Sequence, residues 1–269
     1  MHAWLIVSLS VLLTSLHLHP GQTWHLLWKV PVNGSKLSAD NLGNPFVIQG
    51  DELSKFRDDG SFYRRYSNKT LGAISSLDLR NPLKVLVFYK DFSKIVFLDN
   101  TLSENGSPIY LEELNLAQAS LVCTSFDNGF WVFDPIHYTL IRYNQKLMEV
   151  VNVPNLNQWI GGRIEPNSMT EYENKLYIND PGRGLLVFDI FGTYEKTIPL
   201  KGIQKFQVIG EVIYFSDGQE KIKTFGMKTI REELLPMPDT NYEDWQIGKD
   251  RLYLLGADTL YAYRFQFGK

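Results

Sequence analysis

Two places in the chain combine side chains that proteins use to hold ligands or partners. The segment Trp159–Asn167 joins an indole, a glycine pair, an Arg–Glu pair and an amide within nine residues. Small binding pockets are typically lined by an aromatic surface and a few polar groups. A second indole follows Glu243 and Asp244. The candidate binding residues are therefore Trp159, Arg163, Glu165, Asn167 and Trp245. For both tryptophans, packing of the indole against its own loop or the core is the alternative.

Six aspartates occupy similar positions after apolar segments of the chain. They follow the central residue of each segment by two to five residues: Asp51, Asp91, Asp134, Asp180, Asp217 and Asp258. A ring of carboxylates could attract a cation or a basic partner. Aspartate is also a favoured turn residue, because its carboxylate accepts hydrogen bonds from nearby backbone N–H groups. We favour the turn interpretation for these acids, and we expect Arg183 to be an ordinary turn residue as well.

The sequence offers little for catalysis or metal binding. Its one cysteine, Cys123, ends an apolar stretch and is expected to be buried and inert. Beyond residue 23 there are two histidines, His25 and His137, too few for a His-rich zinc site. Neither a phosphate-binding loop nor a Gly-x-Ser-x-Gly elbow is present. We predict no catalytic residue, metal ligand or cofactor, and lean against an enzyme without excluding one.

The elements that would position these residues repeat along the chain. Six apolar segments are each followed by a polar turn and further strands: 45–48, 85–88, 130–133, 176–178, 212–215 and 252–254. Their central residues are separated by 40, 45, 45, 37 and 39 residues. A period of roughly 40 to 50 residues made of strands is typical of a β-propeller with four strands per blade. We therefore predict a single all-β propeller with six blades.

The repeat also resembles a known type of propeller. In Lys175–Gly192, an apolar strand is followed by an Asn-Asp-Pro-Gly turn and by a second apolar strand that ends in Phe-Asp and a glycine turn. This phrase is similar to the NHL-type repeat of six-bladed propellers, and the resemblance extends over about residues 40–267. It implies rigid blades with loops at the rim and at the central mouth.

A propeller must close, because an open ring leaves strand edges unpaired. The last segment supplies about three strands, whereas residues 24–30 form a spare strand before the first full repeat. We expect residues 24–30 to complete the last blade. The predicted blades are 31–72, 73–118, 119–165, 166–203, 204–241, and 242–267 together with 24–30.

The N-terminus reads as a targeting segment. Residues 3–18 are apolar except for serines, threonine and histidine, and Pro20-Gly21 follows. This length is too short for a comfortable membrane span and suits a signal peptide. We predict a signal peptide over 1–23 and the propeller over 24–269, with no transmembrane span after signal removal. Export to the periplasm, cell envelope or medium follows.

These observations favour a non-catalytic module that presents its loops to a protein partner. The net charge of −3 and the absence of a basic stripe argue against nucleic acid. By analogy with exported bacterial propellers, the partner could belong to a cell-envelope or secretion assembly. Two alternatives remain open: a metal-dependent hydrolase or lyase with its site in the central channel, and a small-ligand or glycan sensor. The oligomeric state is left open.

Overall fold

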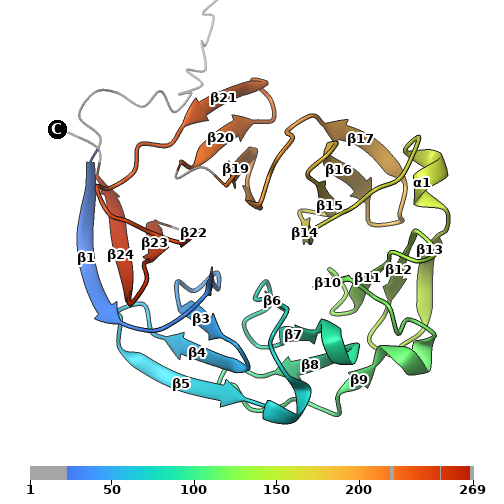
Figure 1. The fold of residues 1–269 in the computed structure, drawn as a ribbon, viewed down its shortest axis with the longest axis horizontal. Helices are drawn as coiled ribbons and strands as arrows, with labels where there is room; N and C mark the ends of the chain where they lie inside the picture. The colour runs from blue at the N-terminus through green and yellow to red at the C-terminus, as the bar shows by residue number, and fades with distance from the viewer. Residues whose placement is uncertain (1–22, 219–220, 249, 267–269) are drawn as a thin grey trace, which may run out of the picture.

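The computed structural model describes residues 23–218, 221–248 and 250–266, and in these ranges the chain forms six four-stranded antiparallel sheets around a central axis (Figure 1). Blades 1 to 3 contain β2 (Lys36–Ala39), β3 (Pro45–Gln49), β4 (Glu52–Phe56) and β5 (Phe62–Ser67); β6 (Ser76–Asp78), β7 (Val85–Tyr89), β8 (Lys94–Leu98) and β9 (Ile109–Tyr110); and β10 (Leu121–Thr124), β11 (Phe130–Asp134), β12 (Thr139–Tyr143) and β13 (Glu149–Val153).

Blades 4 to 6 contain β14 (Ser168–Tyr172), β15 (Lys175–Asp180), β16 (Gly184–Asp189) and β17 (Tyr194–Ile198); β18 (Lys205–Ile209), β19 (Val212–Ser216), β20 (Lys223–Gly226) and β21 (Arg231–Leu234); and β22 (Asp244–Ile247), β23 (Arg251–Leu255), β24 (Thr259–Gln266) and β1 (Thr23–Pro31). The predicted fold class and the six blades are confirmed. The predicted signal peptide lies outside the described residues, apart from Thr23 at the start of β1.

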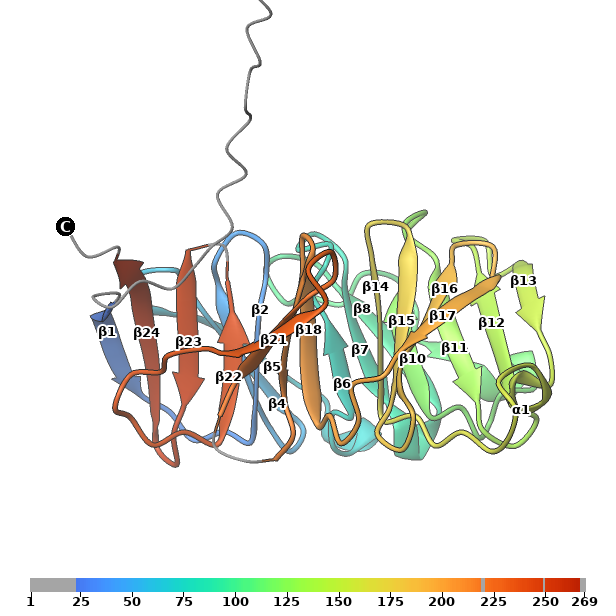
Figure 2. The same ribbon diagram turned by 90° about the horizontal axis from the view of Figure 1, so that it is seen from above.

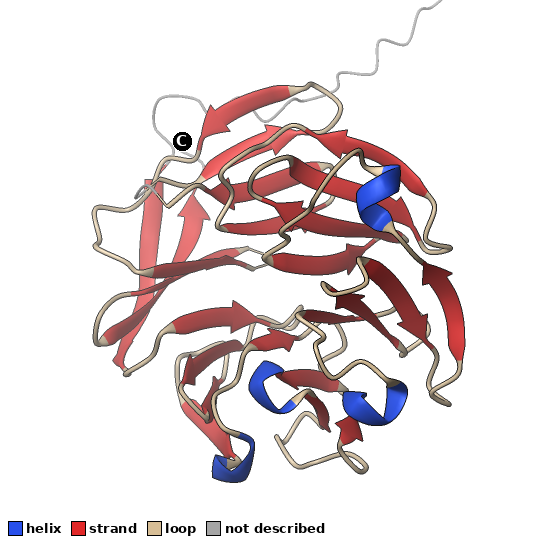
Figure 3. Ribbon diagram, turned by 45° about the vertical axis from the view of Figure 1, so that its right-hand side comes forward, coloured by secondary structure: helices blue, strands red, loops and turns tan. Residues whose placement is uncertain are grey.

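Helical structure is confined to short turns in the part of the chain that the structure describes (Figure 3). These are α1 (Leu156–Trp159) and the 3-10 turns η1 (Lys69–Leu71), η2 (Lys90–Phe92) and η3 (Leu111–Leu114). No helix within the described ranges has the length and apolar character needed to cross a membrane.

The six apolar segments of the sequence are the second strands of the six blades, and their burial explains their composition. Every residue of β7 is buried. Val85, Val87 and Tyr89 pack into a cluster with blade 1, whereas Leu86 and Phe88 pack into a cluster with blade 3. Because both faces of the strand are covered by neighbouring blades, the strand is a continuous apolar run and does not alternate with polar residues.

The ring closes through β1, as predicted. β1 pairs antiparallel with β24, with Trp28 opposite Ala262, and Figure 1 shows the blue strand beside the red one. The indole of Trp28 also reaches blade 1, where it donates to the carbonyl of Asp58 over 2.9 Å. It leaves no room for a side chain at Gly60, where a Cβ would lie 2.7 Å from the ring. One side chain thus joins the closing strand to the first blade.

The loops fall on two faces of the disc, seen edge-on in Figure 2. One side carries the turns between the first and second strands and between the third and fourth strands of each blade, and we call it the hairpin face. The crossover face carries the turns between second and third strands and the connections between blades. Because the strands of each blade are antiparallel and consecutive, these two sets of turns must lie on opposite sides.

Replacing Trp28 with alanine should destabilise the closed ring by about 2–3 kcal/mol, somewhat below the usual cost for a fully buried aromatic because the indole is only half-buried. The shift should appear in the midpoint of urea unfolding. Leu26→Ala on the same strand is the control, because Leu26 is 41% exposed. Equal midpoints for the two variants would contradict the closing role of Trp28.

Candidate functional site

A cavity of about 740 Å³ lies beside blade 4 and opens to solvent. It is lined by Ile160, Arg163 and Glu165 from the loop between blades 3 and 4, by Asp180 to Arg183 from the turn after β15, by Tyr194 and Thr197 of β17, and by Lys201. We call it the blade-4 cleft. Its size is in the range of ligand-binding pockets, and two of the five candidate residues predicted from the sequence line it.

The carboxylate of Asp180 organises the turn that forms one wall of the cleft. Asp180 ends β15 and is 3% exposed. Its Oδ1 accepts a hydrogen bond from the backbone N–H of Gly182 at 2.9 Å, and its Oδ2 accepts one from the N–H of Glu165 at 3.0 Å. The same residue therefore shapes its own turn and anchors the incoming loop. The turn interpretation of the repeated aspartates accounts for Asp180, and for Asp134, whose Oδ1 caps Ile136 N–H at 2.9 Å.

Arg183 fixes the loop on the other side of the cleft. Its guanidinium donates to three backbone carbonyls: those of Arg163 at 3.2 Å, Ile160 at 3.2 Å and Gly161 at 3.4 Å. The guanidinium passes so close to Gly162 that a Cβ there would lie 2.6 Å from Nη2, and Gly162 has φ of +133°. The glycine pair thus permits a close approach and a left-handed backbone, which gives the loop a defined shape.

Two of the predicted residues form an exposed ion pair at the mouth of the cleft. Arg163 Nε lies 2.9 Å from Glu165 Oε1, and both side chains are at least 70% exposed. Such a pair adds little stability, so both groups are available to a partner. Trp159 ends α1 directly before the lining residue Ile160 and is 72% exposed. The structure therefore brings together Arg163 and Glu165, whereas Trp159 does not line the cleft and is next in sequence to a residue that does.

The other two predicted residues lie elsewhere. Asn167 is held within blade 4 and by the connection to blade 5: its Oδ1 accepts from Asn179 Nδ2 of β15 at 2.7 Å, and its own amide donates to the carbonyl of Ile203. Trp245 is 2% exposed in the core between blades 5 and 6, and its indole N–H donates to Ser216 Oγ at 3.0 Å. Neither residue contributes to the blade-4 cleft, and the buried indole presents no open ring face.

Sequence reasoning missed four polar residues of the cleft: Arg183, Tyr194, Thr197 and Lys201. Arg183 was expected to be an ordinary turn residue, whereas it holds a loop that lies twenty or more residues earlier in the chain. The adjacent glycines on both sides of Arg183 were the available signal, because they allow its side chain to lie close against backbone. Tyr194, Thr197 and Lys201 carry no local signal.

Removing the side chain of Arg183 should release this loop without unfolding the blade. We expect Arg183→Ala to accelerate amide hydrogen exchange in a peptide covering residues 157–165, while peptides of blade 2 exchange as before. Arg163→Ala is the matched control, because Arg163 makes one exposed ion pair. Unchanged exchange in Arg183→Ala would show that the loop holds its shape by other contacts.

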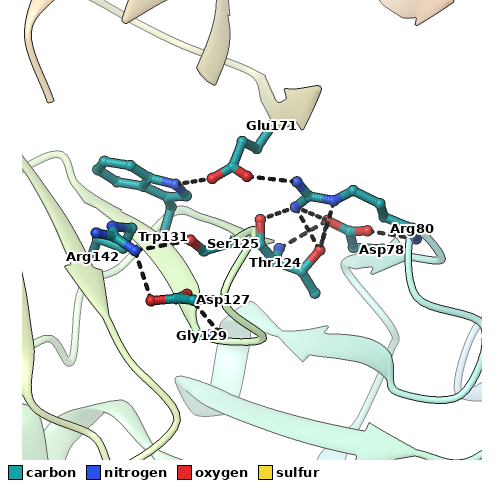
Figure 4. Close-up of polar contacts among 9 residues, drawn as sticks. All are labelled: Asp78, Arg80, Thr124, Ser125, Asp127, Gly129, Trp131, Arg142 and Glu171. Carbon is teal, nitrogen blue, oxygen red and sulfur yellow. Dashed lines mark hydrogen bonds and ion pairs between the residues drawn. The ribbon is translucent and has the colours of Figure 1, made fainter. Parts of the chain in front are cut away.

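A second polar cluster joins blades 2, 3 and 4 near the central axis (Figure 4). Arg80 follows β6, and its Nη1 lies 2.9 Å from Oε1 of Glu171 on β14. Its Nη2 donates to the carbonyl of Thr124 and, at 2.7 Å, to Thr124 Oγ1. The other oxygen of Glu171 accepts the indole N–H of Trp131 at 2.7 Å. Asp78 accepts both the N–H and the hydroxyl of Thr124 at 2.8 Å.

The acids of the innermost strands are thus held in pairs with cations. Asp78 and Glu171 share Arg80, and Asp244 on β22 binds Lys205 Nζ at 2.6 Å and the N–H of Leu37 at 2.6 Å. Among the described residues there is no group of three or more His, Cys, Asp or Glu that could hold a metal ion. These carboxylates join neighbouring blades and do not converge on a common point.

Cys123 and His137 carry no feature of a nucleophilic centre. Cys123 is 1% exposed, and burial raises the pKa of its thiol, so the reactive thiolate is disfavoured. His137 lies on the crossover face, with Nδ1 2.6 Å from Asp134 Oδ2 and a side chain 73% exposed. Cys123 is buried on β10, as expected from the sequence, whereas His137 lies in the exposed turn after β11.

Losing one partner of the Arg80–Glu171 pair should lower the free energy of unfolding more than replacing both partners. Arg80→Met leaves the carboxylate of Glu171, which is 1% exposed, without its cation, and should destabilise the protein by about 3 kcal/mol. The double variant Arg80→Met/Glu171→Gln should regain part of that loss in urea unfolding. If the double variant is less stable than the single one, the uncompensated charge is not the cause.

Comparisons with known proteins show the fold and go no further. Neither protein-family models nor curated protein sequences match the chain. The Pan2 WD40 domain of Neurospora crassa is similar over 90% of this chain and 95% of its own, with TM-score 0.66 and 9% identity. A streptogramin B lyase has TM-score 0.62 and 10% identity, over 91% and 98% of the two chains. BamB from Moraxella catarrhalis has TM-score 0.53 and 11% identity, over 90% and 100%.

Proposed function

We propose that this propeller is a non-catalytic scaffold that acts outside the cytoplasm and binds a protein partner at the blade-4 cleft. The observation that carries the proposal is a cleft that presents Arg163, Arg183 and Tyr194 and is preceded in the chain by the exposed indole of Trp159. Trp, Tyr and Arg are the residues most enriched among those that dominate the energy of protein interfaces.

The construction of the cleft supports binding by preformed loops. The guanidinium of Arg183 and the carboxylate of Asp180 fix the 160–165 loop before any partner arrives. A loop that is already ordered loses less conformational entropy on binding than a free one. Because α1 with Trp159 leads directly into the lining residue Ile160, a partner segment that enters the cleft could also cover the indole.

The apolar character of residues 3–18 supports export. In its finer form, the proposal makes the chain an accessory subunit of a cell-envelope or secretion assembly. The likeness to a streptogramin B lyase supports no enzymatic proposal at 10% identity, and the described acids of the innermost strands are engaged with Arg80 and Lys205.

The proposal is tested by purifying the tagged full chain from its source cells under mild detergent, beside the variant Trp159→Ala. We expect a stoichiometric protein to accompany the native chain and to be lost from the variant, with no change in melting temperature because the indole is 72% exposed. The same mass spectra should show a mature N-terminus after Gly21 or Thr23.

Phe92→Ala is the matched control, because Phe92 is also an exposed aromatic, 47% accessible, and lies in the turn after β7 on the same face of blade 2. It should retain the partner. A native chain that purifies alone, or a partner kept by Trp159→Ala, would contradict the proposed site.

A further inference from the structure

A second cavity of about 200 Å³ lies on the hairpin face between blades 2 and 3, and the proposed partner site does not use it. It is lined by Arg80, Asn81 and Lys84 from the loop after β6, and by Thr124, Ser125, Phe126 and Asn128 at the end of β10 and the turn that follows. We call it the blade 2–3 pocket. Hydrogen bonds already join its two loops: Asn81 Nδ2 donates to Asn128 Oδ1 at 3.0 Å, and Lys84 Nζ donates to the carbonyl of Asn128 at 2.7 Å.

Three residues of the cluster in Figure 4, Arg80, Thr124 and Ser125, also line this pocket. Arg80 is held by Thr124, Asp78 and Glu171, so its orientation is fixed by groups from three blades. The positive charge of Arg80 is already balanced by two carboxylates. Lys84 is the other cation of the pocket, and its Nζ donates to the carbonyl of Asn128. A ligand in this pocket therefore meets polar groups that already have partners, which favours a neutral occupant.

One wall of the pocket is an aromatic ring with a rigid support. Phe126 is 52% exposed. The guanidinium carbon of Arg142 lies 4.9 Å from the centre of its ring, and Arg142 is buried and bound to Asp127 at 2.8 Å. One side of the ring is thus occupied by a fixed cation, and the exposed part of the ring borders a cavity rimmed with amides and hydroxyls.

Neutral sugars match this combination of groups. A sugar ring presents C–H groups that pack on an aromatic surface and hydroxyls that both donate and accept hydrogen bonds. The pocket offers Phe126 for the first and Asn81, Ser125 and Asn128 for the second. Its volume of about 200 Å³ suits one sugar ring and not a longer chain.

We propose that the blade 2–3 pocket binds a single neutral sugar ring, stacked on Phe126 and hydrogen-bonded by Asn81, Ser125 and Asn128. The ring is either a free monosaccharide or the terminal unit of a glycan. This proposal is independent of the partner site, which lies beside blade 4.

The test uses the full chain and saturation-transfer NMR with glucose, galactose, mannose and N-acetylglucosamine, together with an array of glycans that end in these sugars. We expect at least one sugar to receive saturation from the protein. Phe126→Ala should weaken its binding about tenfold, and Phe126→Trp should retain it. Phe191→Ala is the matched control, because Phe191 is 71% exposed on the same face of blade 4; it should bind as the native chain does.

The outcomes distinguish a free monosaccharide from a glycan terminus, and they show which results would contradict the proposal. Binding of free sugars identifies a monosaccharide site, and binding on the array alone identifies a glycan terminus; both support the proposal. No signal from any sugar or glycan overturns it, as does a signal that is equal in Phe126→Ala and the native chain. Phosphate that binds at the pocket where sugars do not would also overturn it. Phe126→Trp keeps the test decisive if the alanine variant unfolds.

Discussion

The structure depends on the burial of apolar side chains between neighbouring blades. The six hydrophobic clusters each join residues of two adjacent blades, as when Val85 and Val87 of blade 2 pack with Phe46 of blade 1. No blade buries both of its faces by itself. A blade is therefore stable only between two others, and the ring behaves as one cooperative unit despite its repeated design.

Two polar clusters add hydrogen bonds and ion pairs between blades to this apolar packing. Arg80 connects blades 2, 3 and 4, and the pair of Lys205 and Asp244 connects blades 5, 6 and 1 through the backbone of Leu37. Burial lowers the pKa of Lys205, which Asp244 opposes. Buried charges of this kind stabilise little by themselves but strongly disfavour arrangements that separate them, so they define which strands lie side by side.

The sequence predicted the fold better than the site, and the reason is physical. Strands buried on both faces leave a continuous apolar run such as residues 85–88, and the spacing of these runs carries the number of blades. Loops have no such periodicity, and α1 was not anticipated. Trp159 and Trp245 have similar surroundings in sequence, yet one is exposed and the other buried, because neighbouring blades decide their environment. The role of Arg183 depends on carbonyl groups of residues 160–163, and a contact of this kind has no local signature.

Blade 6 combines strands from both ends of the described chain, and this arrangement affects the order of folding. Its strand β1 is the first of the described chain and pairs with β24, the last. During synthesis, β1 must wait until more than two hundred later residues have emerged before it can find its partner. Until then the edge of blade 1 lacks the cover of Trp28, and the unpaired strand edges can associate with other chains. Completion of the ring thus joins the strands that are farthest apart along the described chain and covers the edges that remain open until then.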